Sequence, residues 1–128
     1  MKPRKRAVQK ADTAFSRYIR ARDNWTCFTC GRVGYDRDGI MQCGHLITRA
    51  KYATRWNELN AVCQCSGCNM RHEYQPEILT DMWIQENGVE YYHELVRLSN
   101  TLHKLPTSDI EQLAKEFDML YNAIKEES

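Results

Sequence analysis

The sequence predicts a small α+β protein with a ββα-type core that is cross-linked by a bound metal ion and with a helical C-terminal part. Two cysteine pairs with the same spacing, CFTC at 27–30 and CSGC at 65–68, enclose the middle of the chain. Two short apolar segments of strand length lie between these pairs. After residue 76, apolar side chains recur at helical spacing. A length of 128 residues suits one domain, in which a structural metal supplements a moderate core.

The N-terminal region is predicted to be a basic arm followed by an amphipathic helix. Residues 1–7 lack the apolar stretch of a secretory signal, so we expect a flexible arm. Residues 8–23 place Phe15 and Ile19 on one helical face, with Asp12 as a candidate N-cap. This helix begins the predicted metal-bound core, which extends over 8–75.

Two strands and a helix are expected between and just after the cysteine pairs. The segments IMQCGHLI at 40–47 and NAVCQC at 60–65 are short and apolar-rich, as strands are. A polar and aromatic connector over 48–59 joins them. A helix then starts near Cys68 and ends before Pro76. The predicted order is therefore strand, connector, strand and helix.

Residues 76–128 are predicted to form a helical extension of three helices. One helix over 76–88 closes at its final glycine, and a second over 89–105 stops at the following proline. The third, within 107–127, carries an apolar stripe that needs a partner. The stripe packs either on the preceding helix or on its copy in a second chain, which would form a homodimer. Its residues are Ile110, Leu113, Phe117, Leu120, Tyr121 and Ile124.

Charge is distributed unevenly along the chain, although the formal net charge is only +1. Residues 1–72 contain fourteen Lys and Arg against five Asp and Glu, whereas residues 73–128 contain four against twelve. This asymmetry fits either a polyanionic partner for the first half or a solvated dipolar surface. No run of about 18 apolar residues is present, which argues against a membrane span. We therefore expect a cytoplasmic protein.

The six cysteines indicate a metal site, because a chain without a secretory signal stays in a reducing compartment. Two C-x2-C turns can bring four thiolates to one Zn²⁺ in a closed, structural site. The predicted ligands are Cys27, Cys30, Cys65 and Cys68. Cys63 competes with Cys65 as a ligand, but the repeated spacing favours Cys65. Cys43 and Cys63 are then expected to be small buried side chains.

Four polar residues follow one another within and just after the cysteine frame. They are His45, Asn60, Asn69 and His72. This order, with an asparagine directly after the last cysteine, resembles the HNH or ββα-metal nuclease motif in its zinc-framed endonuclease VII form. AFSRYIRARD followed by CGHLITRAKYATRWNELNAVCQCSGCN is similar to the phage NinG (Rap) recombination-nuclease family over about residues 14–75. The resemblance implies a phage-encoded, metal-dependent DNA endonuclease acting on branched or recombination-intermediate DNA, such as a Holliday junction.

These residue types also suit phosphodiester hydrolysis on chemical grounds. His45 suits a general base that activates water, because the ordinary pKa of histidine lies near neutrality. Asn60 would tie the connector together and orient His45. Asn69 would offer an oxygen to Mg²⁺ or Mn²⁺, and His72, on the same helix face, would bind the metal or the phosphate. Glu73 is an alternative oxygen ligand.

The acidic metal ligand of HNH nucleases is missing from this sequence. That ligand usually stands immediately before the base or three positions before it, where this chain has Gly44 and Gln42. Gln42 offers the metal a neutral oxygen only. Three alternatives remain: a metal recruited mainly by DNA phosphate, a softer ion held by His72, or a degenerate site. In the last case the protein is a zinc-bound DNA-binding or adaptor module.

Four cations near the predicted site are candidates for contact with DNA phosphates. They are Arg49, Lys51, Arg55 and Arg71. Tyr52 and Trp56, in the same connector, either stack on unpaired bases or pack the connector against the cysteine frame. His93 lies in the acidic helical part and is expected to be an ordinary surface residue.

Overall fold

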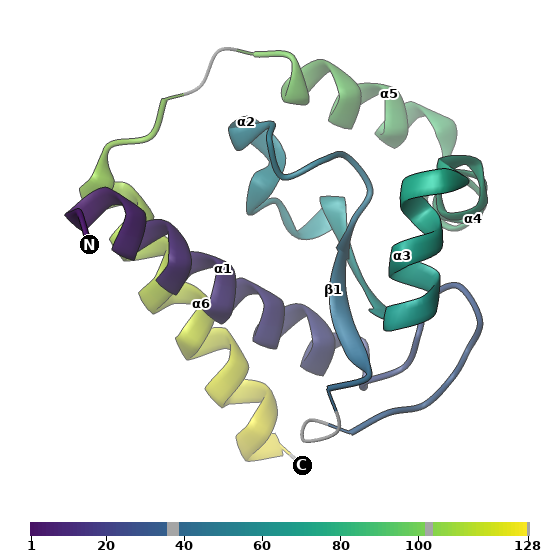
Figure 1. The fold of residues 1–128 in the computed structure, drawn as a ribbon, viewed down its shortest axis with the longest axis horizontal. Helices are drawn as coiled ribbons and strands as arrows, with labels where there is room; N and C mark the ends of the chain where they lie inside the picture. Colours follow the sequence, from purple (N-terminus) through teal and green to yellow (C-terminus); the bar gives the residue numbers. More distant parts are fainter. Residues whose placement is uncertain (36–38, 102–103, 128) are drawn as a thin grey trace.

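The computed structural model describes residues 1–35, 39–101 and 104–127, which are mostly helical with one small sheet (Figure 1). The elements, in chain order, are α1 (Pro3–Arg22), β1 (Met41–His45), α2 (Tyr52–Arg55), a 3-10 turn (Glu58–Asn60), β2 (Ala61–Cys65), α3 (Ser66–Tyr74), α4 (Pro76–Asn87), α5 (Val89–Ser99) and α6 (Thr107–Glu127). The expected mixture of helices with a small sheet is confirmed. Within the described ranges, no helix has the length and apolar character that a membrane span requires.

The antiparallel pair of β1 and β2 stands between α1 and α3 (Figure 1). In this register His45 pairs with Ala61. Side chains alternate along a strand, and His45 lies on the face toward α1, with its ring centroid 5.8 Å from that of Phe15. Gln42 lies on the opposite face, where its amide oxygen accepts a 2.9 Å hydrogen bond from Asn69 of α3. Each face of the sheet is therefore covered by a helix.

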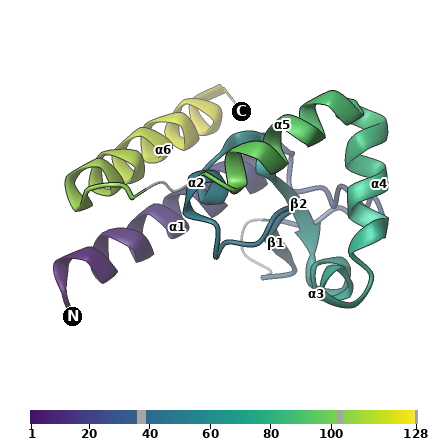
Figure 2. The same cartoon turned by 90° about the horizontal axis from the view of Figure 1, so that it is seen from above.

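The last helix, α6, packs along α1, and the two helices run in the same direction (Figures 1 and 2). Phe117 of α6 meets the Phe15 ring edge-on, with 4.9 Å between centroids, and Ile110 is fully buried in the same core. An exposed salt bridge of 3.2 Å joins Arg17 to Asp118. The expectation that the apolar stripe packs on the preceding helix is therefore wrong, because its partner is the N-terminal helix.

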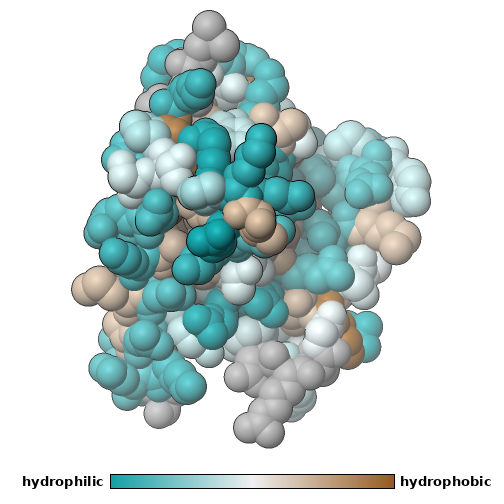
Figure 3. Space-filling model, turned by 60° about the vertical axis from the view of Figure 1, so that its left-hand side comes forward, coloured by the Kyte–Doolittle hydropathy of each residue, from teal (hydrophilic) through white to brown (hydrophobic). Residues whose placement is uncertain are grey.

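The outer side of the α1–α6 pair is polar. Figure 3, which brings this side of the molecule forward, shows a mostly hydrophilic surface with scattered apolar side chains. Met119 is 70% exposed, and Leu120, which the periodicity placed in the stripe, is 40% exposed. The stripe is thus narrower than the sequence predicted, because the contact with α1 covers only one side of α6.

The N-terminal helix starts earlier than predicted. It begins at Pro3, so the flexible arm expected over 1–7 is wrong for all but its first two residues. Proline suits a first helical turn because its missing N–H needs no partner there. Ala7 is 2% exposed, and Arg4 donates a 2.7 Å hydrogen bond to the Leu105 carbonyl. These contacts with the distant C-terminal region stabilise the added residues of the helix.

A second core joins the sheet to the helices that follow it. Its buried members are Leu46, Val62, Leu79, Trp83 and Leu95. The Trp83 indole N–H donates a 2.9 Å hydrogen bond to the Leu59 carbonyl, which fixes α4 against the connector. α5 ends at Ser99, earlier than the predicted stop at Pro106. The helices of the predicted extension pack on the rest of the chain: α4 and α5 complete the core around Trp83, and α6 completes the core around Phe15.

The α1–α6 contact predicts a measurable loss of stability when its central ring is removed. Phe117→Ala is expected to lower the free energy of unfolding by about 3 kcal/mol, because it leaves a cavity beside Phe15. Denaturant titration measures this change, and Met119→Ala on the exposed side of α6 is the matched control. Equal stability of the two variants would contradict the packing of α6 on α1.

Candidate functional site

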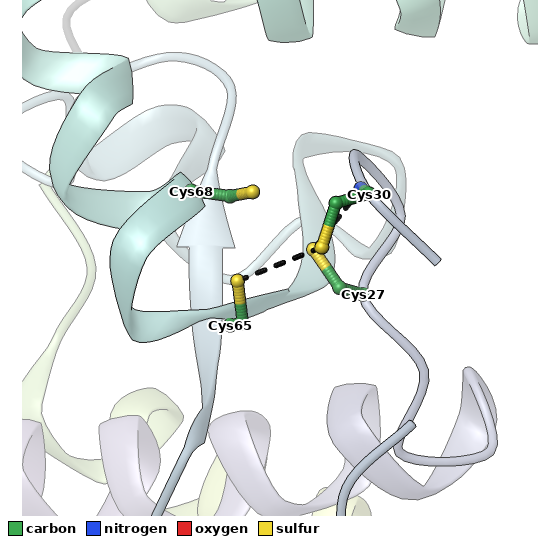
Figure 4. A group of neighbouring side chains, drawn as sticks. All are labelled: Cys27, Cys30, Cys65 and Cys68. Atoms are coloured by element: carbon green, nitrogen blue, oxygen red, sulfur yellow. Dashed lines mark hydrogen bonds between the residues drawn. The ribbon is translucent and has the colours of Figure 1, made fainter. Parts of the chain in front are cut away.

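The four predicted ligand cysteines converge at one point (Figure 4). Two of them lie on the turn that follows α1, one ends β2, and one lies in the first turn of α3. Their sulfur atoms all lie within 4.8 Å of one another, and the Cys30 and Cys65 sulfurs are 3.8 Å apart. Tetrahedral Zn²⁺ with bonds of about 2.3 Å separates its sulfur ligands by about 3.8 Å. The quartet of Cys27, Cys30, Cys65 and Cys68 therefore fits a structural zinc ion.

The first cysteine turn is preorganised by its own backbone. The Gly31 N–H donates a 2.9 Å hydrogen bond to the Cys27 carbonyl, with Gly31 in the left-handed region at φ 78°. The Cys30 N–H points at the Cys27 sulfur, 3.5 Å away. Burial alone would raise the pKa of the Cys27 thiol, but hydrogen bonds from neighbouring backbone N–H groups lower it to about 7. This turn therefore favours the thiolate form that zinc requires.

The two remaining cysteines lie outside the quartet, as predicted. Cys43 and Cys63 face each other across the sheet. Burial raises the pKa of each thiol to about 12, so both stay protonated at neutral pH. Cys63 is fully buried beside Cys27, and Cys43 packs toward α1. Cys63 is thus the small buried side chain that the sequence predicted, whereas Cys43 is only partly buried, and Cys65 rather than Cys63 belongs to the quartet.

His45 ends β1 and is held by the connector. Its Nε2 lies 2.9 Å from the Arg55 carbonyl oxygen. A carbonyl only accepts hydrogen bonds, so Nε2 carries the proton and Nδ1 keeps its lone pair. Burial against α1, together with the nearby Arg49 charge, lowers the pKa of His45 to about 4, although the hydrogen bond to the Arg55 carbonyl acts in the opposite direction. The imidazole is therefore neutral at pH 7, the form that a general base needs.

Asn60 is fully buried and fastens the connector from inside. Its amide nitrogen donates 3.0 Å bonds to the carbonyls of Ile47 and Thr54, and its oxygen accepts a 2.8 Å bond from the Ile47 N–H. None of these bonds reaches the His45 ring. Asn60 instead fixes the peptide next to Arg55, whose carbonyl holds His45. It is therefore a positioning residue that acts through the connector.

Asp12 of α1 anchors the same connector from outside. Its carboxylate accepts bonds from the Arg55 Nε and Nη2, at 3.0 and 2.6 Å, and a 3.0 Å bond from the Trp56 indole. Because α1 begins at Pro3, Asp12 lies in the middle of this helix and is not the N-cap that the sequence predicted. Trp56 is 7% exposed and packs the connector against α1, and not against the cysteine frame as one alternative predicted. Arg55 is paired within the protein, so it is no longer a candidate for DNA contact.

A cleft of about 630 Å³ brings the strand and helix residues of the predicted site together. His45 lines it from β1, and Asn69, His72 and Glu73 line it from α3. Gln42 and Arg49 complete the polar part of its wall. Asn60 lies outside this cleft, in the packed connector. The predicted meeting of a β1 histidine with α3 residues is thus found, within one cavity at the edge of β1.

The side chains of α3 offer some of the ligand atoms that a divalent cation needs. The Asn69 amide nitrogen donates to Gln42, which leaves the Asn69 oxygen available as a ligand. The His72 Nε2 lies 3.2 Å from the Leu46 carbonyl, so its Nδ1 keeps the lone pair. That Nδ1 is buried and has no hydrogen-bond partner among the described residues. A histidine that gives one N–H to a carbonyl presents its other nitrogen as metal ligands do.

The other three residues predicted to contact DNA are exposed but differ in their partners within the protein. Arg49 is exposed at the rim of the cleft, 3.7 Å from the Asp12 carboxylate. Lys51 is exposed and donates a 3.1 Å hydrogen bond to Asn100. Arg71 is exposed on α3 but does not line the cleft. These three side chains are accessible to a polyanion, whereas Arg55 is not.

The sequence analysis missed the contacts of two residues near the site, Asp12 and Gln64. Nothing in the helical periodicity of α1 marked Asp12 as the anchor of a connector that begins about 35 residues later. Gln64, in β2, is 1% exposed and comes into contact with Gly44 of β1. The glycine inside a strand was the available signal, because such a glycine often marks a close approach by another group.

The cysteine quartet predicts a specific metal dependence. Cys65→Ser is expected to lose the single zinc ion per chain and the cooperative unfolding transition, because three sulfurs bind zinc far more weakly than four. Elemental analysis and circular dichroism measure both effects. Cys43→Ala is the matched control and should keep one zinc ion. Zinc loss in both variants, or in neither, would contradict the assignment of the quartet.

The low pKa of His45 predicts a pH dependence of stability. Between about pH 6.5 and pH 4 the unfolded chain binds a proton at this residue and the folded protein does not, so stability falls as pH falls through this window. His45→Gln should therefore lose less stability than the wild type between pH 7 and pH 5. Denaturant titrations at both pH values measure the difference, with exposed His93→Gln as control. An identical pH dependence in His45→Gln and wild type would refute the prediction.

Comparison with known proteins extends the resemblance to almost the entire chain. A family model described as the bacteriophage lambda NinG protein matches residues 1–127. Nothing among the curated proteins and nothing among the solved structures matches the chain. The matched range includes the cysteine quartet, the cleft and the helices that enclose them. The chain therefore belongs to the NinG family of bacteriophage proteins.

Proposed function

We propose that this protein is a metal-dependent DNA endonuclease of the HNH type that hydrolyses phosphodiester bonds. The observation that carries the proposal is the neutral His45, fixed by the Arg55 carbonyl and lining one cleft with Asn69 and His72. The adjoining cysteine quartet supports it, because it joins the turn after α1 to the segment that bears the α3 residues. Branched or recombination-intermediate DNA as the substrate rests on the resemblance to recombination nucleases.

In this mechanism His45 takes a proton from the attacking water. Nδ1 accepts the proton while the Nε2–H bond to the Arg55 carbonyl keeps the ring in place. The Arg55 carbonyl and, to a smaller extent, the Asp12 carboxylate raise the pKa of His45 against the effects of burial and of Arg49, so both stabilise the imidazolium that forms. Asn60 and Asp12 both hold the connector, so each acts on His45 through its position.

The catalytic cation would be Mg²⁺ or Mn²⁺, held in the cleft by the Asn69 oxygen, with His72 and Glu73 as further candidates. When bound, it would neutralise charge on the phosphate oxygens and assist departure of the leaving oxygen. The Gln42 oxygen already accepts a hydrogen bond from Asn69, which suits Gln42 to orienting that amide. Gln42 is accordingly a positioning residue in this proposal.

The proposed partner is the DNA backbone. Arg49 at the rim of the cleft, Lys51 on the connector and Arg71 on α3 are exposed. Lys51 also lines a neighbouring hollow of about 370 Å³ with Arg4 and Lys104, and no carboxylate side chain lines it. Such a cationic surface attracts phosphates without reading sequence.

A zinc-bound DNA-binding or adaptor module is the second candidate function. The observation that favours it is the absence of an acidic side chain at positions 42 and 44 beside the cleft. Neutral amide ligands hold Mg²⁺ weakly. The two candidates differ in one respect that can be measured, because both bind DNA but only the enzyme cuts it in a His45-dependent way.

Cleavage of a four-way junction and of a matched linear duplex tests the proposed function. With Mg²⁺ or Mn²⁺ present, His45→Ala is expected to reduce the cleavage rate by at least about 100-fold, because the water loses its base. DNA binding, measured by gel shift, should persist. His93→Ala is the control and should cut as the wild type does. Equal nicking by wild type and His45→Ala would remove His45 from the mechanism, and binding without cutting by the wild type would favour the adaptor.

A further inference from the structure

The space beside Gly44 is filled by another residue. A Cβ atom added to Gly44 would lie 2.1 Å from the Gln64 Oε1 and 2.9 Å from its Cδ. It would also lie 3.2 Å from the Asn69 Oδ1. No side chain fits at position 44 unless Gln64 moves. The glycine is therefore required by the approach of Gln64 from the neighbouring strand.

Gln64 is held in this position but is only half satisfied. Its side chain is 1% exposed, and its amide nitrogen donates a 2.9 Å hydrogen bond to the Thr29 hydroxyl. Its amide oxygen is buried and has no hydrogen-bond partner among the described residues. A buried carbonyl oxygen normally has a donor or a cation beside it, because its desolvation is otherwise uncompensated. None of the described residues donates to this oxygen, so its partner would have to come from outside the folded chain.

A second oxygen is aimed at the same place. Gln42 fixes the Asn69 side chain by accepting from its amide nitrogen, and this leaves the Asn69 Oδ1 beside the Gly44 position. The Gln64 and Asn69 oxygens thus approach one point from β2 and from α3. A cation that lies beside the Gln64 Oε1 satisfies this unpaired oxygen and takes the Asn69 Oδ1 as a second ligand.

We infer that the Gln64 Oε1 is an oxygen ligand for a hard divalent cation, together with the Asn69 Oδ1. The Gln64 oxygen lies about as far from the added Cβ as an aspartate oxygen lies from its own Cβ. Gln64 thus supplies from the neighbouring strand the oxygen that an acidic residue at position 44 would supply. Because both ligands are neutral, the ion is held weakly without DNA, and the phosphate backbone completes its shell. This inference rests on the proposed metal site of the cleft.

Binding of Mn²⁺ to the zinc-loaded protein tests the inference without DNA. Electron paramagnetic resonance of free Mn²⁺ gives the dissociation constant for the wild type, Gln64→Glu, Gln64→Met and Asn69→Ala. Gln64→Glu keeps the shape and adds a charge, so it should bind Mn²⁺ about tenfold more tightly. Gln64→Met and Asn69→Ala should bind about tenfold more weakly. Gln112→Glu, which adds a charge at an exposed position on α6, should bind as the wild type does.

Thermal unfolding separates a ligand from a merely structural residue. If Gln64→Glu is folded, Mn²⁺ should raise its melting temperature more than that of the wild type, because a ligand bound to the native state stabilises it. Equal Mn²⁺ affinity in Gln64→Glu, Gln64→Met and wild type would overturn the inference, as would a wild type that binds no Mn²⁺ at millimolar concentration. Mn²⁺ binding that depends on Gln64 in a protein that never cuts DNA would retain the inference and refute the proposed nuclease.

Discussion

The architecture depends on the convergence of four cysteine sulfurs from two distant parts of the chain. Cys27 and Cys30 follow α1, whereas Cys65 and Cys68 span the junction of β2 and α3. A two-stranded sheet is too small to be stable alone. Joining its end to the turn after α1 gives the sheet a fixed position between two helices. The cleft at the edge of β1 exists because this junction fixes the start of α3 relative to β1.

Two polar side chains, the partly buried Asp12 and the buried Asn60, hold the connector in place at the edge of the cleft. Asp12 binds the connector from the side of α1, and Asn60 binds it from within. Both hold the backbone around Arg55, whose carbonyl holds the ring of His45. The proposed role of His45 as a general base requires that its tautomer and direction are fixed before the substrate arrives. Here a helix carboxylate, a buried amide and a carbonyl fix them together, and no direct hydrogen bond from Asn60 to His45 is needed.

The helices after the sheet complete cores that the N-terminal segments cannot complete alone. α6 completes the core that α1 forms with Trp56 and Ala61, and α4 and α5 cover the side of β2 around Val62. The family match over residues 1–127 includes both of these cores. The part of the chain after residue 75 thus belongs to the same folded unit as the cleft, and α1 links the two through Phe15.

The sequence by itself determined the features that depend on local spacing: the cysteine quartet, the two strands, the three later helices and the order of His45, Asn60, Asn69 and His72. The tertiary structure alone decided which surfaces meet. Periodicity shows that α6 has an apolar face but does not name α1 as its partner, and charge does not show that Arg55 is bound to Asp12. The same holds for Gly44 and Gln64, which pack together although they lie on different strands. Contacts between residues far apart in sequence depend on packing in three dimensions. The order of residue types along one sequence does not show which of these residues will meet.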